Sequence, residues 1–163
     1  MAKRRYFDHR AEVRRNLADI DEVVSNAVEQ EDLLVQSYLI RYATIRLSGA
    51  VEQAMVTMVR GFLQENTSHR VLRYSSQHAN RINNLNPSKL ETLVRSFDEQ
   101  WARELEVFLG EDERRQTLGN LIQARHDLAH GKSSSVNASR LELYRTIATE
   151  TVDLLFDWFL PIK

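Results

Sequence analysis

The 163-residue sequence contains no cysteine, only two prolines and five glycines, and no apolar run long enough to span a membrane. Without cysteine the chain can form neither disulfide bonds nor thiolate ligands for a metal. No apolar segment follows the charged N-terminus, so nothing indicates a signal peptide, and we expect a cytoplasmic protein with no membrane partner. The scarcity of proline and glycine leaves few points at which a helix must end.

The chain has no large excess of either charge, because its 22 basic and 23 acidic residues give a net charge of -1. The basic and acidic residues are, however, concentrated in different segments of the sequence. Residues 1–15, 60–95 and 114–145 each contain six basic residues and two acidic ones, whereas acidic residues concentrate in 16–59 and 96–113. Basic blocks of this kind are compatible with a phosphate-binding surface and also with solvated helix faces. Both interpretations stay open at this stage.

What the chain does contain is a regular spacing of apolar residues at steps of three and four, without the alternation that indicates strands. We therefore predict an all-α fold, a bundle of about five to six helices in a single domain over residues 1–163. Long helices are expected over 31–64, 87–109 and 139–160. Asn86 and Pro87 have the form of a helix cap and a first-turn proline, and Gly131 is expected to end the helix before it.

The stretch LIQARHDLAHGK, residues 121–132, places several ionisable side chains in the last two turns before Gly131. His126 and His130 are four residues apart and share a helix face, whereas Arg125 and His130 are separated by about 140° around the helix axis. An arginine that neutralises a phosphate and a histidine that transfers a proton suit phosphodiester chemistry. The alternative is that these residues are ordinary polar groups at a helix end.

The motif RHDLAHG resembles the signature of the HEPN superfamily of metal-independent ribonucleases: an arginine followed by a polar residue, and a histidine after a spacer of four to six residues. Arg125, His126 and His130 fill these three places. The segments YLIRYATIRLSGAVEQ, LVRSFDEQWARELEVFL, LGNLIQARHDLAHGKSS and SRLELYRTIATETVDLL resemble, in order, the pieces of the RiboL-PSP type of HEPN domain. The resemblance covers about Tyr38 to Leu155.

This resemblance implies a helical bundle that dimerises, so that two copies of the motif face each other in a composite cleft. The family's catalytic roles pass to Arg125 and His130, and a supporting polar role passes to His126, with no metal and no cofactor. Asparagine is the commoner residue at the place of His126, and histidine is among the allowed substitutes. Some toxin relatives are controlled by nucleotide transfer to a tyrosine two places after the histidine, where this chain has Lys132.

Glu52 is a further candidate, because it lies on a helix stripe with apolar neighbours and a carboxylate there needs a partner. We expect that partner to be Arg125 or a histidine of the motif, with Arg41 or an exposed edge of the stripe as the alternative. Asp127 is given a supporting role within the motif. The residues predicted to contact RNA are Arg4, Arg5 and Lys132.

The leading functional hypothesis is an endoribonuclease that uses the 2′-hydroxyl of RNA and leaves a 2′,3′-cyclic phosphate. Its expected partners are the RNA substrate, a second copy of the chain and, in a toxin–antitoxin setting, an antitoxin protein; defence and RNA processing are the other settings. One alternative is a zinc-dependent hydrolase in which His126 and His130 of HDLAH bind the metal with Glu150 as a third ligand. The other is a non-catalytic helical module that binds RNA or protein.

Overall fold

The computed structural model describes residues 8–79, 81–132 and 135–161, with only the backbone described for 76–78. These residues form seven helices and no strand, which confirms the all-α prediction. The helices are α1 (His9–Glu29), α2 (Leu33–Asn66), α3 (His69–Ala79), α4 (Pro87–Arg95), α5 (Glu99–Gly110), α6 (Arg114–Ala129) and α7 (Ala138–Phe159). In this part of the chain no helix is both long enough and apolar enough to cross a bilayer.

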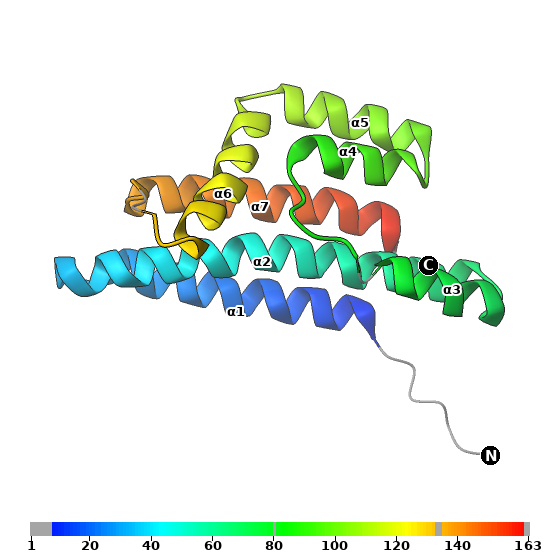
Figure 1. Cartoon of the computed structure of the whole chain (residues 1–163), viewed down its shortest axis with the longest axis horizontal. Helices are drawn as coiled ribbons and strands as arrows, with labels where there is room; N and C mark the ends of the chain where they lie inside the picture. The colour runs from blue at the N-terminus through cyan, green and yellow to red at the C-terminus, as the bar shows by residue number, and fades with distance from the viewer. Residues whose placement is uncertain (1–7, 80, 133–134, 162–163) are drawn as a thin grey trace, which may run out of the picture.

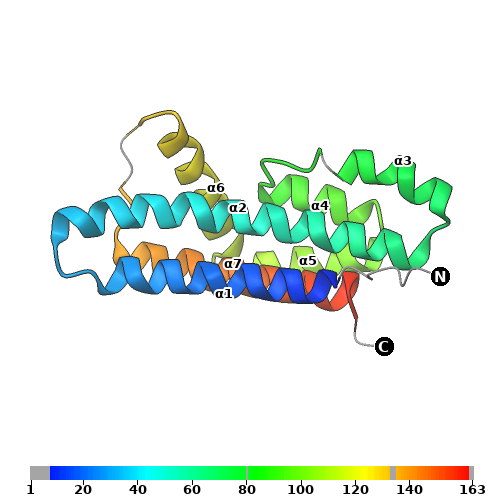
Figure 2. The same ribbon diagram turned by 90° about the horizontal axis from the view of Figure 1, so that it is seen from below.

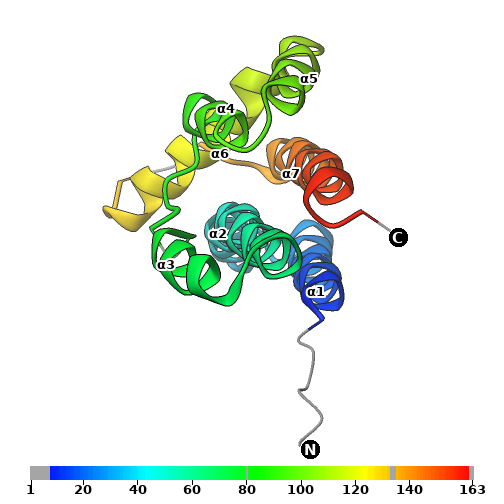
Figure 3. The same ribbon diagram turned by 90° about the vertical axis from the view of Figure 1, so that its right-hand side faces the viewer.

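Helices α1, α2 and α7 run along the long axis of the molecule and pack against one another (Figure 1). The longest, α2, has 34 residues and therefore extends for about 50 Å beside α1 (Figure 2). Seen from the end, the three helices enclose a common core (Figure 3), to which they contribute fully buried side chains such as Val13, Met55 and Leu155. This bundle is the base on which the remaining helices lie.

Helices α4 and α5 pair with each other beyond α7, where Trp101 stacks on Trp158 with ring centroids 5.9 Å apart. Helix α6 begins next to α5 and crosses the molecule steeply until its last turns reach α2 (Figure 1). Leu118, Leu121 and Ile122 anchor α6 in the core. The C-terminal end of α6, which contains the RHDLAHG motif, is thereby placed beside the first half of α2.

The expected helix over 87–109 is wrong as a single element, because it divides into α4 and α5. The side chain of Asp98 accepts hydrogen bonds from the backbone N–H groups of Gln100 (2.7 Å) and Trp101 (3.0 Å) and so caps a new helix. Phe97 packs against the core at the break, which lets the apolar spacing continue across it. This division, together with the unexpected helix α3, explains why there are seven helices rather than five or six.

Two helix ends predicted from the sequence are confirmed by the structure. The Asn86 side chain accepts a hydrogen bond from the Lys89 N–H at 2.9 Å, with Pro87 in the first turn of α4. Gly131 follows the C-cap of α6 with a φ of +72°, a left-handed conformation that glycine adopts without strain. One side of α7 is buried in the core, and its residues are Leu141, Tyr144, Ile147, Val152, Leu155 and Phe159.

Candidate functional site

The RHDLAHG motif occupies the end of α6 and its C-cap. His130 is the capping residue, and its backbone N–H is shared between the carbonyls of His126 and Asp127 at 3.2 Å each. Gly131 then turns the chain away from the helix axis. The imidazole of His130 therefore lies at an open helix end rather than within the packed part of α6.

The two histidines of the motif lie side by side, as their spacing predicts. The ring centroids of His126 and His130 are 4.4 Å apart and the ring planes meet at 61°, an edge-to-face contact. Both side chains are exposed. Two groups that can transfer protons are thus adjacent and open to a substrate.

Arg125 lies on a different side of α6 and is half-buried. Its Nη1 atom donates a hydrogen bond to the side-chain oxygen of Asn84 at 3.2 Å, and Asn84 belongs to the loop between α3 and α4. Among the described residues no carboxylate pairs with Arg125. A partly desolvated guanidinium that faces only a neutral amide keeps its charge available for an anion.

The expected partners of Glu52 are wrong. One of its carboxylate oxygens accepts a hydrogen bond from the backbone N–H of Leu85 at 3.3 Å, and it pairs with neither Arg125, a motif histidine nor Arg41. The reason is that the loop before α4 contacts both helices, and the backbone of Leu85 supplies the partner of the carboxylate. Since Asn84 contacts Arg125 and the next residue contacts Glu52, this loop links the two side chains indirectly.

Asp127 forms hydrogen bonds that hold the chain immediately after α6 in place. Its carboxylate accepts hydrogen bonds from Gln123 Nε2 at 3.0 Å and from Lys132 Nζ at 3.2 Å, and its carbonyl accepts the Lys132 N–H at 2.9 Å. The hydrogen bond from Lys132, supplemented by that from Gln123, holds the pKa of the Asp127 carboxyl below its usual range. Asp127 thus acts on the shape of the helix end, and Lys132 is exposed beside it.

The other residues predicted to bind RNA, Arg4 and Arg5, lie outside the described residues. Within the described ranges, several cations of the basic blocks are already neutralised by carboxylates. These pairs are Arg14 with Asp153, Arg95 with Glu106, Arg114 with Glu150, Arg115 with Glu91, and Arg145 with Glu142. Part of the positive charge in these blocks is therefore not available to a ligand. Arg125 differs from these arginines because its partner, the side chain of Asn84, is neutral.

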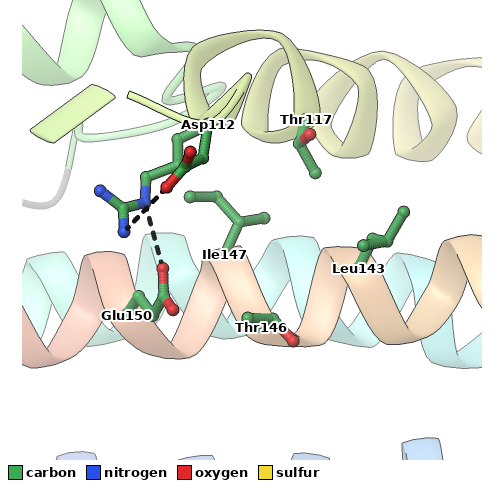
Figure 4. A pocket seen from close by; sticks show the side chains of 7 residues that line it. Asp112, Thr117, Leu143, Thr146, Ile147 and Glu150 are labelled. Carbon is green, nitrogen blue, oxygen red and sulfur yellow. Dashed lines mark ion pairs between the residues drawn. The ribbon is translucent and has the colours of Figure 1, made fainter. Parts of the chain in front are cut away.

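The structure does not assemble the ligand set of the zinc alternative. Glu150 of α7 lies 3.3 Å from Arg114, at the opposite end of α6 from the two histidines, and a dashed line in Figure 4 marks its ion pair with this guanidinium. In the part of the chain that the structure describes, no three His, Asp or Glu side chains gather as metal ligands. Glu150 is engaged by a guanidinium instead.

One feature beside the motif was not predicted from the sequence. A cavity of about 330 Å³ lies between α1, α2 and the motif, lined by Ile20, Ile45, Arg46, Gly49, Ala50 and Arg125. The sequence carries one sign of it, a glycine inside an otherwise continuous helix. Only the fold shows that this glycine and Arg46 face the same space as Arg125.

A comparison with family models gives one match, described as RiboL-PSP-HEPN, over residues 8–160. The chain belongs to this family. The match spans all seven helices of the described residues and is wider than the resemblance over about Tyr38 to Leu155. Comparisons with curated proteins and with solved structures found no match.

Proposed function

We propose that this HEPN domain is a metal-independent endoribonuclease whose site consists of Arg125, His126 and His130. The observation that carries the proposal is the half-buried guanidinium of Arg125, which has a neutral partner and immediately precedes a pair of exposed imidazoles. The family match supports a nuclease-type module in general terms. The setting of such an activity is a toxin–antitoxin, defence or RNA-processing system, with an antitoxin protein as the partner in the first case.

In this reaction the 2′-oxygen of a ribose attacks the adjacent phosphorus. The bond from phosphorus to the 2′-oxygen forms, the bond to the 5′-oxygen of the next nucleotide breaks, and the products carry a 2′,3′-cyclic phosphate and a 5′-hydroxyl. One base removes the 2′ proton and one acid protonates the leaving 5′-oxygen, and His130 serves in one of these roles. Arg125 stabilises the charge that builds on the phosphate oxygens. DNA lacks the attacking hydroxyl and is not a substrate.

A second copy of the chain completes this site. By helix spacing, Arg125 and His130 of one chain lie about 140° apart around the axis of α6. Two facing motifs can therefore bring an arginine and a histidine to the same phosphate more easily than one motif can. Helix α2 also exposes a short apolar strip near its N-terminal end, formed by Leu34 and Tyr38, with exposed fractions of 66% and 60%. Apolar strips of this kind commonly mark interfaces. We therefore include a two-fold homodimer in the proposal.

The direct test is cleavage of end-labelled single-stranded RNA by the purified protein in excess EDTA. The expected products have cyclic phosphate and 5′-hydroxyl ends, while DNA of the same sequence and RNA methylated at the reacting 2′-oxygen remain intact. Activity that EDTA removes and zinc restores would favour the metal hydrolase. Binding of RNA without any cleavage would favour the non-catalytic module.

A further inference from the structure

The cavity beside Arg125 has two kinds of surface. It is lined by the apolar residues Ile20, Ile45, Gly49 and Ala50 and by two basic residues, Arg46 and Arg125. A volume of about 330 Å³ is at the lower end of the range for small-molecule sites. This combination suits a ligand that is flat and apolar in one part and anionic in another.

Gly49 keeps the cavity open at a cost to helix α2. Glycine is among the least favourable residues in a helix interior, and many glycines there are explained by a close neighbour. A Cβ atom added at Gly49 would meet nothing within 4 Å, whereas one added at Gly61 of the same helix would lie 2.6 Å from Leu160 Cδ2. Packing within the chain therefore explains Gly61 and not Gly49.

Arg46 resembles Arg125 in lacking an acidic partner. Its Nη1 donates a hydrogen bond to the hydroxyl of Tyr42 at 2.6 Å, and its guanidinium carbon is 5.6 Å from the centroid of that ring. No carboxylate pairs with Arg46 within the described ranges. Two arginines that have no carboxylate partner among the described residues thus line one largely apolar cavity. Guanidinium planes bind phosphate and also stack on bases.

We propose that this cavity binds the unpaired base of a nucleotide that flanks the scissile phosphate. Arg125 contacts the scissile phosphate, and Arg46 contacts the phosphate on the other side of the same nucleotide. A base engaged in a duplex cannot enter, so the substrate class is single-stranded RNA. The inference rests on the proposed ribonuclease function and adds a substrate-binding role for Arg46 and the cavity walls.

The test fills the cavity and removes the base separately. Gly49→Leu places a side chain into the open space, and Gly110→Leu is the matched control, because its Cβ also meets nothing within 4 Å and it lies at the end of α5. The substrates are a short single-stranded RNA with one cleavable bond and the same RNA with an abasic ribose on one or the other side of that bond. KM and kcat are measured for each protein with each of these RNAs.

For the wild type and Gly110→Leu, removal of one of the two flanking bases raises KM by about tenfold or more, the size of a lost stacking contact. Gly49→Leu already has this higher KM with intact RNA, and its KM does not rise further with the abasic RNA. Arg46→Ala raises KM and leaves kcat nearly unchanged. A Gly49→Leu protein that cleaves like the wild type and still responds to the missing base overturns the inference.

Two further outcomes are decisive. If sedimentation shows that Gly49→Leu is monomeric where the wild type is dimeric, the glycine serves a contact between chains, and the base-binding role is overturned. If the wild type cleaves no RNA, the proposed function fails, and the cavity is then judged by fluorescence anisotropy with the intact and abasic RNAs. Equal affinities for the two RNAs overturn the inference, and weaker binding of the abasic RNA supports it.

Discussion

Arg125 holds a full charge, half-buried, against the neutral amide of Asn84. A cation in that position can stabilise a bound phosphate, and this stabilisation becomes stronger as the reaction adds negative charge to the phosphate oxygens. Replacing Arg125 or His130 by alanine should lower kcat/KM for RNA cleavage by about 10²-fold or more in each case. Both residues lie outside the apolar side of α6, so circular dichroism should show that the variants stay folded.

Matched substitutions exist elsewhere on the surface. Arg103→Ala on α5 and His69→Ala at the start of α3 remove the same kinds of side chain from exposed positions. Their rates should remain those of the wild type. Wild-type rates in His130→Ala would instead remove this histidine from the mechanism and turn attention to a binding module.

Asp127 allows a prediction about pH. Its carboxyl pKa is lowered in the folded state, chiefly by the hydrogen bond from Lys132. A lowered folded pKa means that the charged carboxylate stabilises the fold above the pKa of the unfolded chain, and that this contribution disappears as the pH falls through the folded pKa. Asp127→Asn should therefore lower the melting temperature slightly at neutral pH, and the difference should disappear as the pH falls below the ordinary pKa range of an aspartate carboxyl.

The control for this measurement is Asp19→Asn, an exposed carboxylate of α1 with no ion pair among the residues that the structure describes. It should not reproduce the pH-dependent difference. If the melting-temperature difference between the wild type and Asp127→Asn stayed the same at acidic pH, the shape of the side chain and not its charge would stabilise the end of α6.

Within helix α2, the two glycines should respond oppositely to alanine. Gly49→Ala removes an unfavourable helix residue without a clash and should raise the free energy of unfolding by about 0.5–1 kcal/mol. Gly61→Ala places a Cβ against Leu160 and His9, and because Leu160 is only 1% exposed it has little room to move. The expected loss is about 1–3 kcal/mol, measured by urea unfolding. Equal effects at the two positions would contradict the packing described here.

The elements differ in how far the sequence could predict them. Local signals suffice for Asn86, Pro87 and Gly131, because a cap or a left-handed turn depends on a few neighbouring residues. The break at Asp98 was missed because the apolar spacing runs on through Phe97, and a capping aspartate looks the same as an ordinary helix residue in the sequence. Contacts such as that between Glu52 and Leu85 join distant segments, and no spacing rule could supply them.

The motif could be identified from the sequence because its residues are close together in the chain. The position of Arg46 beside the same cavity as Arg125 depends on the packing of α2 against α6, which no spacing in the sequence indicates. The spacing of His126 and His130 predicted their shared face, and the ring contact at 4.4 Å agrees with it. The assignment of catalytic roles to these residues stays a prediction.

At the scale of the whole molecule, the distribution of paired and unpaired charges predicts how RNA binding depends on salt. Affinity should fall as salt rises, with a logarithmic slope of about -0.7 for each phosphate contacted on a single strand. Replacing Arg4 and Arg5 together by alanine should reduce the slope by about 1.4 and leave cleavage in place. Arg95→Ala is the control, because Glu106 and Glu99 already neutralise that charge. Binding that does not change with salt would place the basic blocks away from the RNA.

The final prediction concerns assembly. A lone chain offers Arg125 and His130 on different sides of α6 and leaves Leu34 and Tyr38 of α2 in water. A dimer joined along the N-terminal part of α2, with the two motifs facing, would cover these side chains and bring both kinds of group to one phosphate. Sedimentation velocity at micromolar concentration should therefore show a dimer. The double variant Leu34→Glu with Tyr38→Glu should be a folded monomer that has lost RNA cleavage.

Val107→Glu provides the comparison for this variant, because Val107 is an apolar residue of α5 that is 65% exposed and remote from the motif. It adds a glutamate to an exposed apolar position outside the proposed interface and should remain dimeric and active. The dimer is proposed because the chemistry needs two proton transfers around one phosphate, so loss of assembly and loss of cleavage should occur at the same protein concentration. A wild-type monomer with full activity would show that one motif is sufficient and would remove the second chain from the site.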